Sequence, residues 1–271
     1  MQTIVKTEVG SFMVLPNDSL GKELIVKGDF EPHFSQVIRN IIKTGNTCID
    51  AGANLGYHTV GMARLVGKNG HVISFEPLRI IYQQLCGNVF INDLRNVTCL
   101  NNALGNSNDM VCMNFVDVDS ENVNIGGTTI GYGGDVVEII KLDDLHLTDV
   151  TFMKIDVQGS EVRLLQGAHK TINKFRPIMF IEVENIWLNQ FGTSSEELLN
   201  ILLSMNYMLV RINTNYPCDH IAIPKEKNFM FAEIIKNLQF PYDIIDGKSV
   251  KIYFDRTSYS DMLYGTFEVT L

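Results

Sequence analysis

The sequence predicts an α/β protein built on a mostly parallel β-sheet. Apolar runs typical of buried strands alternate with segments of helical periodicity, and a glycine-bearing turn joins one of these strands to a helix. Two successive strand candidates also end in an acidic residue. The 271 residues, of which 45% are hydrophobic, suffice for one large domain with appendages.

Composition and charge argue against several classes of protein. The net charge of −9 disfavours a broad nucleic-acid-binding surface, because phosphate contacts require clustered Lys and Arg. The five cysteines are widely spaced and include no C-x-x-C pair, which fits reduced thiols. Neither a signal-peptide pattern nor an apolar run of the roughly 20 residues that span a membrane is found. We therefore expect a cytoplasmic protein with no nucleic-acid partner and no membrane span.

An N-terminal cap is expected over residues 1–45. Residues 9–15 and 23–26 have the composition of two short strands separated by a turn, which predicts a hairpin. Pro32 then opens a helical pattern over residues 33–43, with its apolar side chains on one face. This cap precedes the strongest functional signal of the chain.

Residues 46–225 carry the regular alternation and form the predicted main domain. Helices are expected over residues 57–66, 78–90 and 161–175 and from about residue 195, where Thr193 or Ser194 would cap the helix. Strands are expected over residues 47–49, 71–76, 97–100, 110–116, 136–141, 150–156, 178–184, 207–212 and 219–223, with a turn at residues 101–103.

Two segments depart from this alternation. Residues 104–145 include a glycine-rich stretch, which predicts either a loop over a site or a flexible surface loop between strands. Residues 226–271 show no clear period, and the sequence assigns them no role. Their many aromatic residues indicate packing over the sheet edge or a subunit contact in a homo-oligomer.

The stretch from Asp50 to Gly56 is the most informative part of the sequence. It follows an apolar strand and precedes a helical pattern, and Gly52 and Gly56 leave room for close approach of a ligand to the backbone. Glu76 ends the next strand about 20 residues after Gly56, where a ribose-binding carboxylate is expected. This arrangement predicts a nucleotide-cofactor site, and an ordinary strand-to-helix turn is the simpler alternative.

Two cofactors compete for this turn. A dinucleotide such as NAD requires backbone amides aimed at a pyrophosphate, usually through G-x-G-x-x-G, and here the middle glycine is missing. S-adenosylmethionine has no phosphate and carries a sulfonium and an ammonium group, so a carboxylate at Asp50 would attract it. We therefore favour S-adenosylmethionine over NAD.

Several short motifs stand in an order that resembles one family. The resemblance is to the FkbM family of S-adenosylmethionine-dependent methyltransferases, and it covers roughly Gly28 to Tyr207. Where the family usually has Lys-Ile-Asp-Val-Glu-Gly, this chain has Gln158 in place of the glutamate. The motifs are Phe30-Glu31-Pro32, Asp50-Ala51-Gly52-Ala53-Asn54-Leu55-Gly56-Tyr57, Phe75-Glu76-Pro77, Asn102-Ala103-Leu104-Gly105, Leu142-Asp143-Asp144-Leu145 and Lys154-Ile155-Asp156-Val157-Gln158-Gly159-Ser160-Glu161, with Gly167-Ala168.

The resemblance implies a Rossmann-like class I methyltransferase fold, with about seven strands in a mostly parallel sheet and helices on both faces. It also implies methyl transfer to an oxygen of an acceptor that is often a sugar or a glycosylated metabolite. The turn after the first strand would hold the amino-acid end of the cofactor, Glu76 its ribose, and the residues after the third strand its adenine. The implied cofactor-binding residues are Glu31, Asp50, Gly52, Ala53, Asn54, Gly56, Glu76, Pro77, Asn102, Ala103 and Asp156.

Asp156 is the first candidate for a catalytic base, because it ends a buried strand where substrate would meet the cofactor. We expect burial to raise its pKa; capping the next helix is its alternative role. Glu182 ends the following strand and is a second candidate, and the two carboxylates are able to bind Mg²⁺ or Mn²⁺. His58 and His33 are alternative bases, or else packed or surface histidines.

The function predicted from the sequence is thus S-adenosylmethionine-dependent O-methylation of a sugar, a glycan or a glycosylated metabolite. Two rival interpretations remain. One is an NAD-dependent oxidoreductase, and the other is a non-catalytic binding module that keeps a methyltransferase-like fold. The identity of the acceptor lies beyond what the sequence encodes.

Overall fold

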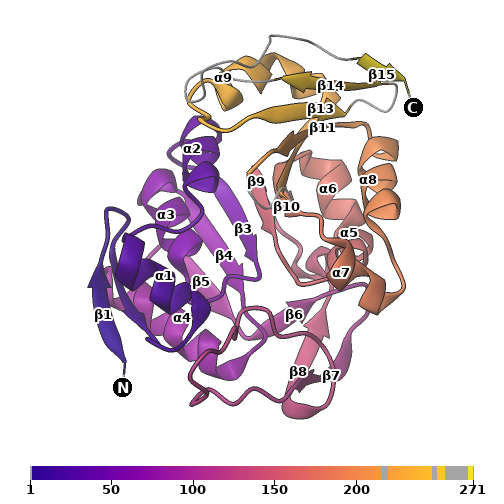
Figure 1. The fold of residues 1–271 in the computed structure, drawn as a ribbon. Coiled ribbons are helices and arrows are strands. Elements are labelled where there is room, and N and C mark those ends of the chain that lie inside the picture. Colours follow the sequence, from indigo (N-terminus) through magenta and orange to yellow (C-terminus); the bar gives the residue numbers. More distant parts are fainter. Residues whose placement is uncertain (1, 215–218, 246–248, 254–267, 271) are drawn as a thin grey trace.

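The computed structural model describes residues 2–214, 219–245, 249–253 and 268–270 (Figure 1). One large sheet forms its centre and carries helices on both faces. From one edge to the other, the sheet contains β5 (Val97–Leu100), β4 (His71–Phe75), β3 (Thr47–Ala51), β9 (Phe152–Ile155), β10 (Ile178–Glu182), β12 (Asp219–Pro224), β11 (Tyr207–Ile212), β13 (Tyr242–Ile245), β14 (Ser249–Tyr253) and β15 (Glu268–Thr270).

The five strands from β5 to β10 are parallel, and β12 and the strands beyond it pair antiparallel. Parallel strands are buried on both faces, and this explains why β3, β9 and β10 read as nearly continuous apolar runs. The predicted α/β fold with a mostly parallel sheet is confirmed. The seven strands from β5 to β11 correspond to the predicted sheet, and three C-terminal strands extend it.

Helices cover the two faces of the sheet in separate apolar layers. One layer contains α2 (Pro32–Ile41), α3 (Tyr57–Val66) and α9 (Phe231–Ile235). The opposite layer contains α5 (Glu161–Gly167), α6 (His169–Phe175) and α8 (Ser195–Ser204), which Ser194 caps. α4 (Arg79–Ile91) packs beside β5.

The single helix predicted over residues 161–175 is instead two helices, α5 and α6. Gly167 ends the first of them, and a Cβ there would lie 1.8 Å from the carbonyl oxygen of Gly105. The chain therefore approaches Gly105 closely at the point where one helix stops and the next begins. This contact is non-local, so helical periodicity does not reveal it.

The predicted N-terminal hairpin exists, but one of its two strands is formed by a different segment from the one predicted. β1 (Thr3–Lys6) pairs with β2 (Ser11–Val14), whereas residues 23–26, expected as a strand, belong to α1 (Ser19–Lys27). Asp18 caps this helix by accepting a hydrogen bond from the amide of Gly21 at 3.2 Å. Gly28 ends it in the left-handed conformation. These caps outweigh the strand-like composition of the four residues.

The hairpin is attached to α4 by side-chain amides. Asn88 accepts from the backbone N–H of Met13 at 2.7 Å, and Gln84 donates to the carbonyl of Met13 at 2.7 Å. One turn further along, Asn92 bonds both the N–H of Ser11 at 3.0 Å and its carbonyl at 2.7 Å. Gln84 and Asn88 lie on α4 and Asn92 is its C-cap, so the three amides, four residues apart, form one row along a helix face.

A second sheet of three strands lies beside the first. It contains β6 (Asn102–Leu104), β8 (Gly133–Ile140) and β7 (Asp109–Asn114) in that order. The turn predicted at residues 101–103 is therefore wrong, because Asn102 begins a strand that pairs in parallel with β8. The shorter elements are η1 (Leu142–Leu145), α7 (Asn185–Leu188), η2 (Asn189–Phe191) and η3 (Lys225–Met230).

The C-terminal segment, which the sequence left without a role, contributes η3, α9 and strands β13 to β15. Some of its aromatic residues lie outside the described residues, and so does Cys218. The cysteines at positions 48, 86, 99 and 112 are free in the described structure. No helix within the described ranges is both long enough and apolar enough to cross a bilayer.

The contacts of Asn88 predict a stability effect. Asn88 is fully buried and also donates to the carbonyl of Leu55 at 2.8 Å, so Asn88→Ala leaves several buried backbone groups without partners. We expect a loss of about 2–3 kcal/mol of unfolding free energy, measured by urea denaturation. Asn200→Ala, at an exposed site on α8, is the matched control. Equal losses of unfolding free energy for the two substitutions would contradict the stabilising role assigned to Asn88.

Candidate active site

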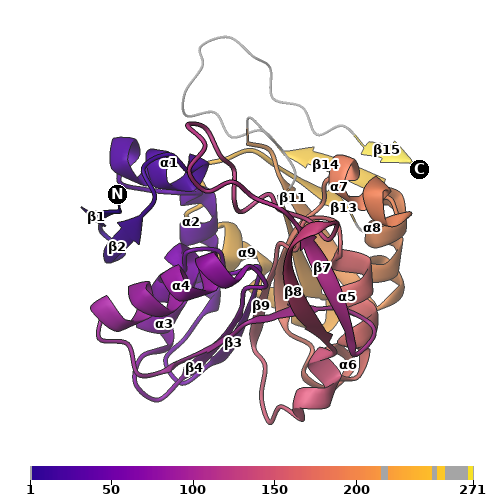
Figure 2. The same ribbon diagram turned by 90° about the horizontal axis from the view of Figure 1, so that it is seen from below.

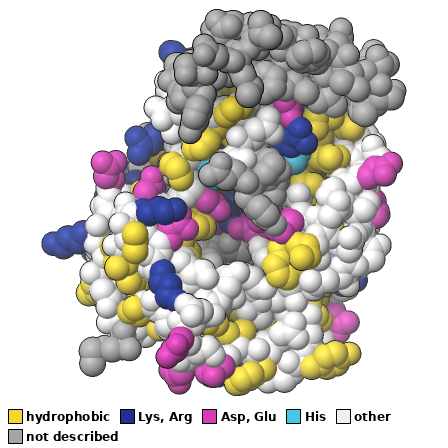
Figure 3. Space-filling view, viewed as in Figure 1, with side chains coloured by type: hydrophobic (Ala, Val, Ile, Leu, Met, Phe, Trp, Pro, Cys, Tyr) yellow, Lys and Arg dark blue, Asp and Glu magenta, His cyan; other side chains and the backbone are white. Residues whose placement is uncertain are grey.

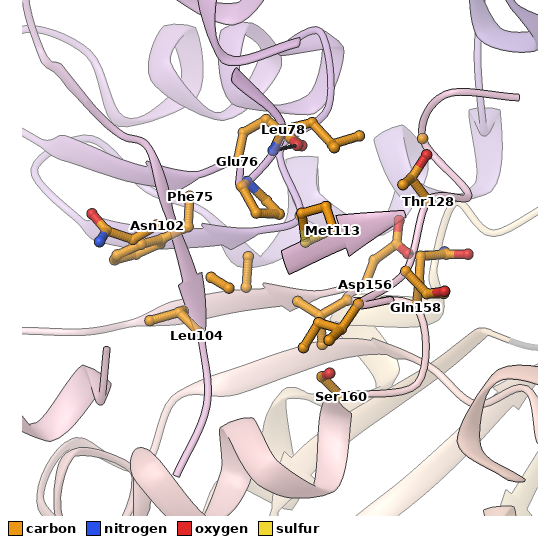
Figure 4. Close-up of a pocket in the computed structure, with 18 of the residues that line it drawn as sticks. Phe75, Glu76, Leu78, Asn102, Leu104, Met113, Thr128, Asp156, Gln158 and Ser160 are labelled. Carbon is orange, nitrogen blue, oxygen red and sulfur yellow. Dashed lines mark hydrogen bonds between the residues drawn. The ribbon is translucent and has the colours of Figure 1, made fainter. Parts of the chain in front are cut away.

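A cleft opens at the carboxyl ends of β3, β4 and β9, where strand-end loops converge (Figures 3 and 4). The space not filled by atoms between its walls and in the solvent directly in front of them amounts to about 600 Å³. Figure 3 shows Asp and Glu side chains gathered around the hollowed centre of this face. The lining includes Gly52, Glu76, Asn102, Thr128, Asp156 and Gln158.

The turn after β3 forms one wall of the cleft. Gly52 has a φ of +80°, and a Cβ at this position would lie 1.8 Å from the carbonyl oxygen of Asp156. Only glycine fits there, because both the conformation and the contact exclude a side chain. The amides of Gly52 and Ala53 donate to the carbonyl of Phe75 at 3.0 and 2.9 Å, which fixes the turn against β4.

Glu76 lies directly after β4 and faces the cleft (Figure 4). Its two oxygens accept hydrogen bonds from the amides of Asn54 and Leu78, each at 2.9 Å. Burial nevertheless dominates and raises the pKa of Glu76 to about 7. A carboxylate has about four lone-pair positions, so Glu76 retains the capacity to accept two further hydroxyl donors.

Lys154, on the central strand β9, holds a buried charge at the base of the cleft. Its ammonium group donates to Asp156 Oδ2 at 2.8 Å and to the carbonyl of Gly52 at 3.3 Å. Burial disfavours its charge, but the surrounding carboxylates, Asp156 first and then Asp50, raise the pKa of Lys154. The ammonium group therefore remains charged at any physiological pH.

The expected rise in the pKa of Asp156 is not found. Burial opposes its ionisation, but the charge and hydrogen bond of Lys154 outweigh burial and lower the pKa of Asp156. The neighbouring Glu182 shows the opposite effect, since burial and the charge of Asp156 raise the pKa of Glu182 well above its usual value. Glu182 thus keeps its proton at a pH where Asp156 has lost its own.

Gln158 connects these two carboxyl groups. Its amide nitrogen donates to Asp156 Oδ1 at 2.9 Å and to Glu182 Oε2 at 3.0 Å. Gln158 has a φ of +49°, a conformation that is uncommon for a residue other than glycine. Both oxygens of Asp156 are consequently engaged, one by Gln158 and the other by Lys154.

The expectation of Mg²⁺ or Mn²⁺ finds no support. Within the described ranges, no group of three or more His, Cys, Asp or Glu side chains is arranged to hold a metal ion. The charge of the site agrees with this finding, because the ammonium group of Lys154 lies 2.8 Å from Asp156 and would repel a divalent cation bound to that carboxylate.

Both candidate histidines are paired with carboxylates. His58 lies 2.7 Å from Glu31, and its hydrogen bond and charge lower the pKa of Glu31 despite burial. His33 lies 2.7 Å from Asp219. Burial raises the pKa of Asp219, although its bond to His33 acts in the opposite direction. Neither histidine lines the cleft.

Asp50 lies beneath the cleft rather than in its wall. It is fully buried, and its Oδ2 accepts from the hydroxyl of Thr59 at 2.5 Å. Its other oxygen is buried and has no hydrogen-bond partner among the described residues. Asp50 therefore acts on the site through its charge, chiefly on Lys154 in the neighbouring strand.

The structure brings about half of the predicted site residues into one lining. Those in the lining are Gly52, Glu76, Pro77, Asn102, Ala103 and Asp156. Those outside it are Glu31, Asp50, Ala53, Asn54, Gly56, His58 and Glu182. Sequence reasoning missed the roles of Lys154 and Gln158. A lysine within the apolar run of β9 was the available signal, because lysine is rarely buried without a partner.

The sheet topology and the cleft at its strand ends define an α/β enzyme of the kind that binds a nucleotide-containing cofactor. A family model described as "Methyltransferase FkbM domain" matches residues 50–209, more than half of the chain. The chain belongs to this family of S-adenosylmethionine-dependent methyltransferases. The resemblance inferred from the ordered motifs is thereby confirmed.

Solved structures with similar folds include methyltransferase FkbM from Methylobacillus flagellatus KT, with 21% identity and a TM-score of 0.47. That match covers 66% of this chain and 43% of the other, so this chain spans less than half of that relative. An S-adenosylmethionine-dependent O-methyltransferase from Thermotoga maritima has 17% identity, coverage of 81% and 76%, and a TM-score of 0.44. No curated protein matches the sequence.

The buried lysine leads to a prediction about stability and pH. Lys154→Met leaves the charges of Asp156 and Asp50 without their counterion, so we expect a loss of about 3–5 kcal/mol at pH 8. Urea denaturation at pH 8 and pH 5 measures it. Because Asp156 takes up a proton more readily once Lys154 no longer lowers its pKa, the loss at pH 5 should be smaller.

In the wild-type protein, the ion pair of Lys154 and Asp156 should contribute about the same stability at pH 5 as at pH 8. Asp156 has a lowered pKa and contributes stability above its unfolded value of about 3.9. Lys154 has a raised pKa and contributes stability below its unfolded value of about 10.4. Lys68→Met, at an exposed position, is the control and should change little. A penalty for Lys154→Met that grows on acidification would refute the ion-pair account.

Proposed function

We propose that this chain transfers a methyl group from S-adenosylmethionine to a hydroxyl oxygen of a sugar, a glycan or a glycosylated metabolite. The observation that carries the proposal is the charge of the cleft. Glu76 and Asp156 line it, and among the described lining residues there is no Lys or Arg. Such a surface suits a cationic sulfonium cofactor and offers no partner for the pyrophosphate of NAD.

The cleft residues fit the parts of this cofactor in order. Asn102, which precedes Ala103 on β6, lies at one end of the cleft, Asp156 and Gln158 lie at the other, and Glu76 lies between them (Figure 4). We assign the first pair to the adenine, Glu76 to the ribose hydroxyls, and the end near Asp156 to the amino-acid portion and the methyl group. The free lone pairs on Glu76 support this assignment.

The chemistry proposed is a direct displacement. When bound, S-adenosylmethionine supplies an electrophilic methyl carbon; a C–O bond forms as the C–S bond breaks and its electron pair passes to sulfur. Asp156 accepts the hydrogen bond and then the proton of the acceptor hydroxyl. Lys154 keeps Asp156 ionised and at the same time lowers its basicity, and Gln158 fixes its orientation, so Asp156 acts through its position beside the acceptor hydroxyl. Positioning supplies much of the rate.

Neutral side chains in the cleft lining favour a polyhydroxylated acceptor. Thr128 and Thr129 supply hydroxyl groups, Gln158 an amide, and Phe191 an aromatic ring. Such a mixture of an aromatic side chain and neutral hydrogen-bonding groups suits a sugar, which presents both C–H and O–H groups. We therefore propose a carbohydrate hydroxyl, within a small molecule or a glycan, as the methyl acceptor.

Cofactor binding should depend on the protonation of Glu76. Because ribose hydroxyls donate to the carboxylate, binding favours the ionised form. Affinity for S-adenosylhomocysteine should therefore rise from pH 6 to pH 8, through the pKa of about 7, and then level off. Glu76→Gln should weaken binding about tenfold and remove this pH dependence. Isothermal titration calorimetry at pH 6, 7 and 8 measures both effects.

Glu196→Gln, on the exposed surface of α8, serves as the control for charge removal and should leave affinity and pH dependence unchanged. Tight binding of NAD instead of S-adenosylhomocysteine would support an oxidoreductase. An unaltered pH dependence in Glu76→Gln would remove Glu76 from the ribose site.

Methyl transfer should require Asp156 as a base. Asp156→Asn preserves the shape of the side chain but cannot accept the proton, so we expect kcat to fall about 10²–10⁴-fold. Affinity for S-adenosylhomocysteine should fall far less than kcat, because Asp156 is one of several groups that line the cofactor site. The assay is release of S-adenosylhomocysteine with a panel of sugars and glycosides as acceptors, and Asp93→Asn at an exposed turn is the control. Cofactor binding without turnover on any acceptor class would favour a non-catalytic binding module.

A further inference from the structure

The loop between β7 and β8, residues 115–132, is named the cleft loop here. It extends from the three-stranded sheet to α1 of the N-terminal cap (Figure 2). Its returning half lines the cleft, and Thr128 lies at the same end of the cleft as Gln158 (Figure 4). The loop thus contacts the proposed cofactor site on one side and the N-terminal cap on the other.

Asp18 joins the cleft loop to the cap with a buried carboxylate. Its Oδ2 caps α1 through the amide of Gly21, and its Oδ1 accepts from the amide of Ile125 at 3.0 Å. Two backbone hydrogen bonds flank this contact: Val123 accepts from the amide of Ser19 at 2.9 Å and donates to the carbonyl of Asn17 at 3.2 Å. One carboxylate oxygen of Asp18 therefore caps α1, and the other holds the cleft loop.

Asn17 holds the other half of the cleft loop. Its side-chain amide donates to the carbonyls of Val118 at 2.6 Å and Ser120 at 2.8 Å. Lys22, one turn into α1, donates to the carbonyl of Glu121 at 2.9 Å. The outer part of the loop is therefore bonded to the cap mostly through its own backbone carbonyls, which sets its position whatever its side chains are.

The inner side of the cleft loop packs closely against residues beside the cleft. Ile125 is fully buried in an apolar cluster with Leu78 and Ile81, which follow Glu76 by two and five residues. The next residue, Gly126, lies against Asn54 of the turn after β3, where a Cβ would be 2.2 Å from the side-chain nitrogen. The hydrogen bond of Asp18 to Ile125 thus acts one residue away from the cleft wall.

We propose that Asn17 and Asp18 are positioning residues that hold the cleft loop over the site and thereby set the residence time of the cofactor. The inference rests on the proposed function of the cleft. Neither residue lines the cleft, so both act through the loop. Release of these bonds lets Gly126 and Thr128 move away from the cleft, which opens a path for the cofactor to leave.

One substitution separates the two roles of Asp18. Serine is a good helix cap but is too short to reach the amide of Ile125, so Asp18→Ser keeps α1 capped and removes the side-chain bond to the loop, which loosens the loop next to Gly126. Asn17→Ala removes only the bonds to the outer half. We expect each variant to release S-adenosylhomocysteine about tenfold faster than wild type in stopped-flow measurements, the effect of losing about one net hydrogen bond.

Ser194→Ala is the matched control. Ser194 caps α8 by accepting from the amide of Glu197, far from the cleft loop, so its loss tests a purely structural effect. It should lower the melting temperature and leave the release rate unchanged. Release rates for Asp18→Ser and Asn17→Ala that equal that of wild type, whatever their melting temperatures, would overturn the proposal.

A second readout does not depend on the cofactor. Hydrogen exchange of the Ile125 amide should be faster in Asp18→Ser, and proteolysis after Glu121 should be faster in Asn17→Ala. Unchanged exchange and unchanged cleavage would overturn the proposal. Failure of the wild type to bind S-adenosylhomocysteine would instead refute the proposed function, and the exchange result would still show whether these residues hold the loop.

Discussion

The buried charge of Lys154 is the interaction on which the arrangement of the site depends. It lies on a strand with neighbours on both sides, so its ammonium group cannot reach bulk water and must be balanced within the fold. Its bonds join the carbonyl of Gly52 to the carboxylate of Asp156, which fixes two strand ends relative to each other. Because such a pair costs desolvation, it gives the site a defined geometry rather than extra stability.

The parallel sheet explains why so many polar groups meet at one place. Strands that run in the same direction bring their carboxyl ends to one edge, where the apolar layers stop and the backbone turns away. Asp156 follows β9 and Glu182 ends the neighbouring β10, and Gln158 donates a hydrogen bond to each of them. One carboxyl group ionises easily and the other does not, as expected for two acids close enough to repel each other.

Local patterns of sequence predicted much of this fold. The alternation of strands and helices, the turn from Asp50 to Gly56 and the position of Glu76 all follow from short-range periodicity and spacing. The short strand at Asn102 escaped prediction because its partner lies more than thirty residues away. The lowered pKa of Asp156 was not predicted either, because burial alone raises the pKa of a carboxyl group. The compensating charge of Lys154 is visible only in the three-dimensional structure.

The row of amides on α4 has a consequence for how the chain behaves among other chains. A two-stranded hairpin normally leaves backbone groups unpaired along its edges, and such edges invite pairing with a strand of another molecule. Here Gln84, Asn88 and Asn92 occupy the outward-facing N–H and C=O groups of β2, as a third strand would. The helix thereby protects this edge against intermolecular β-pairing and aggregation.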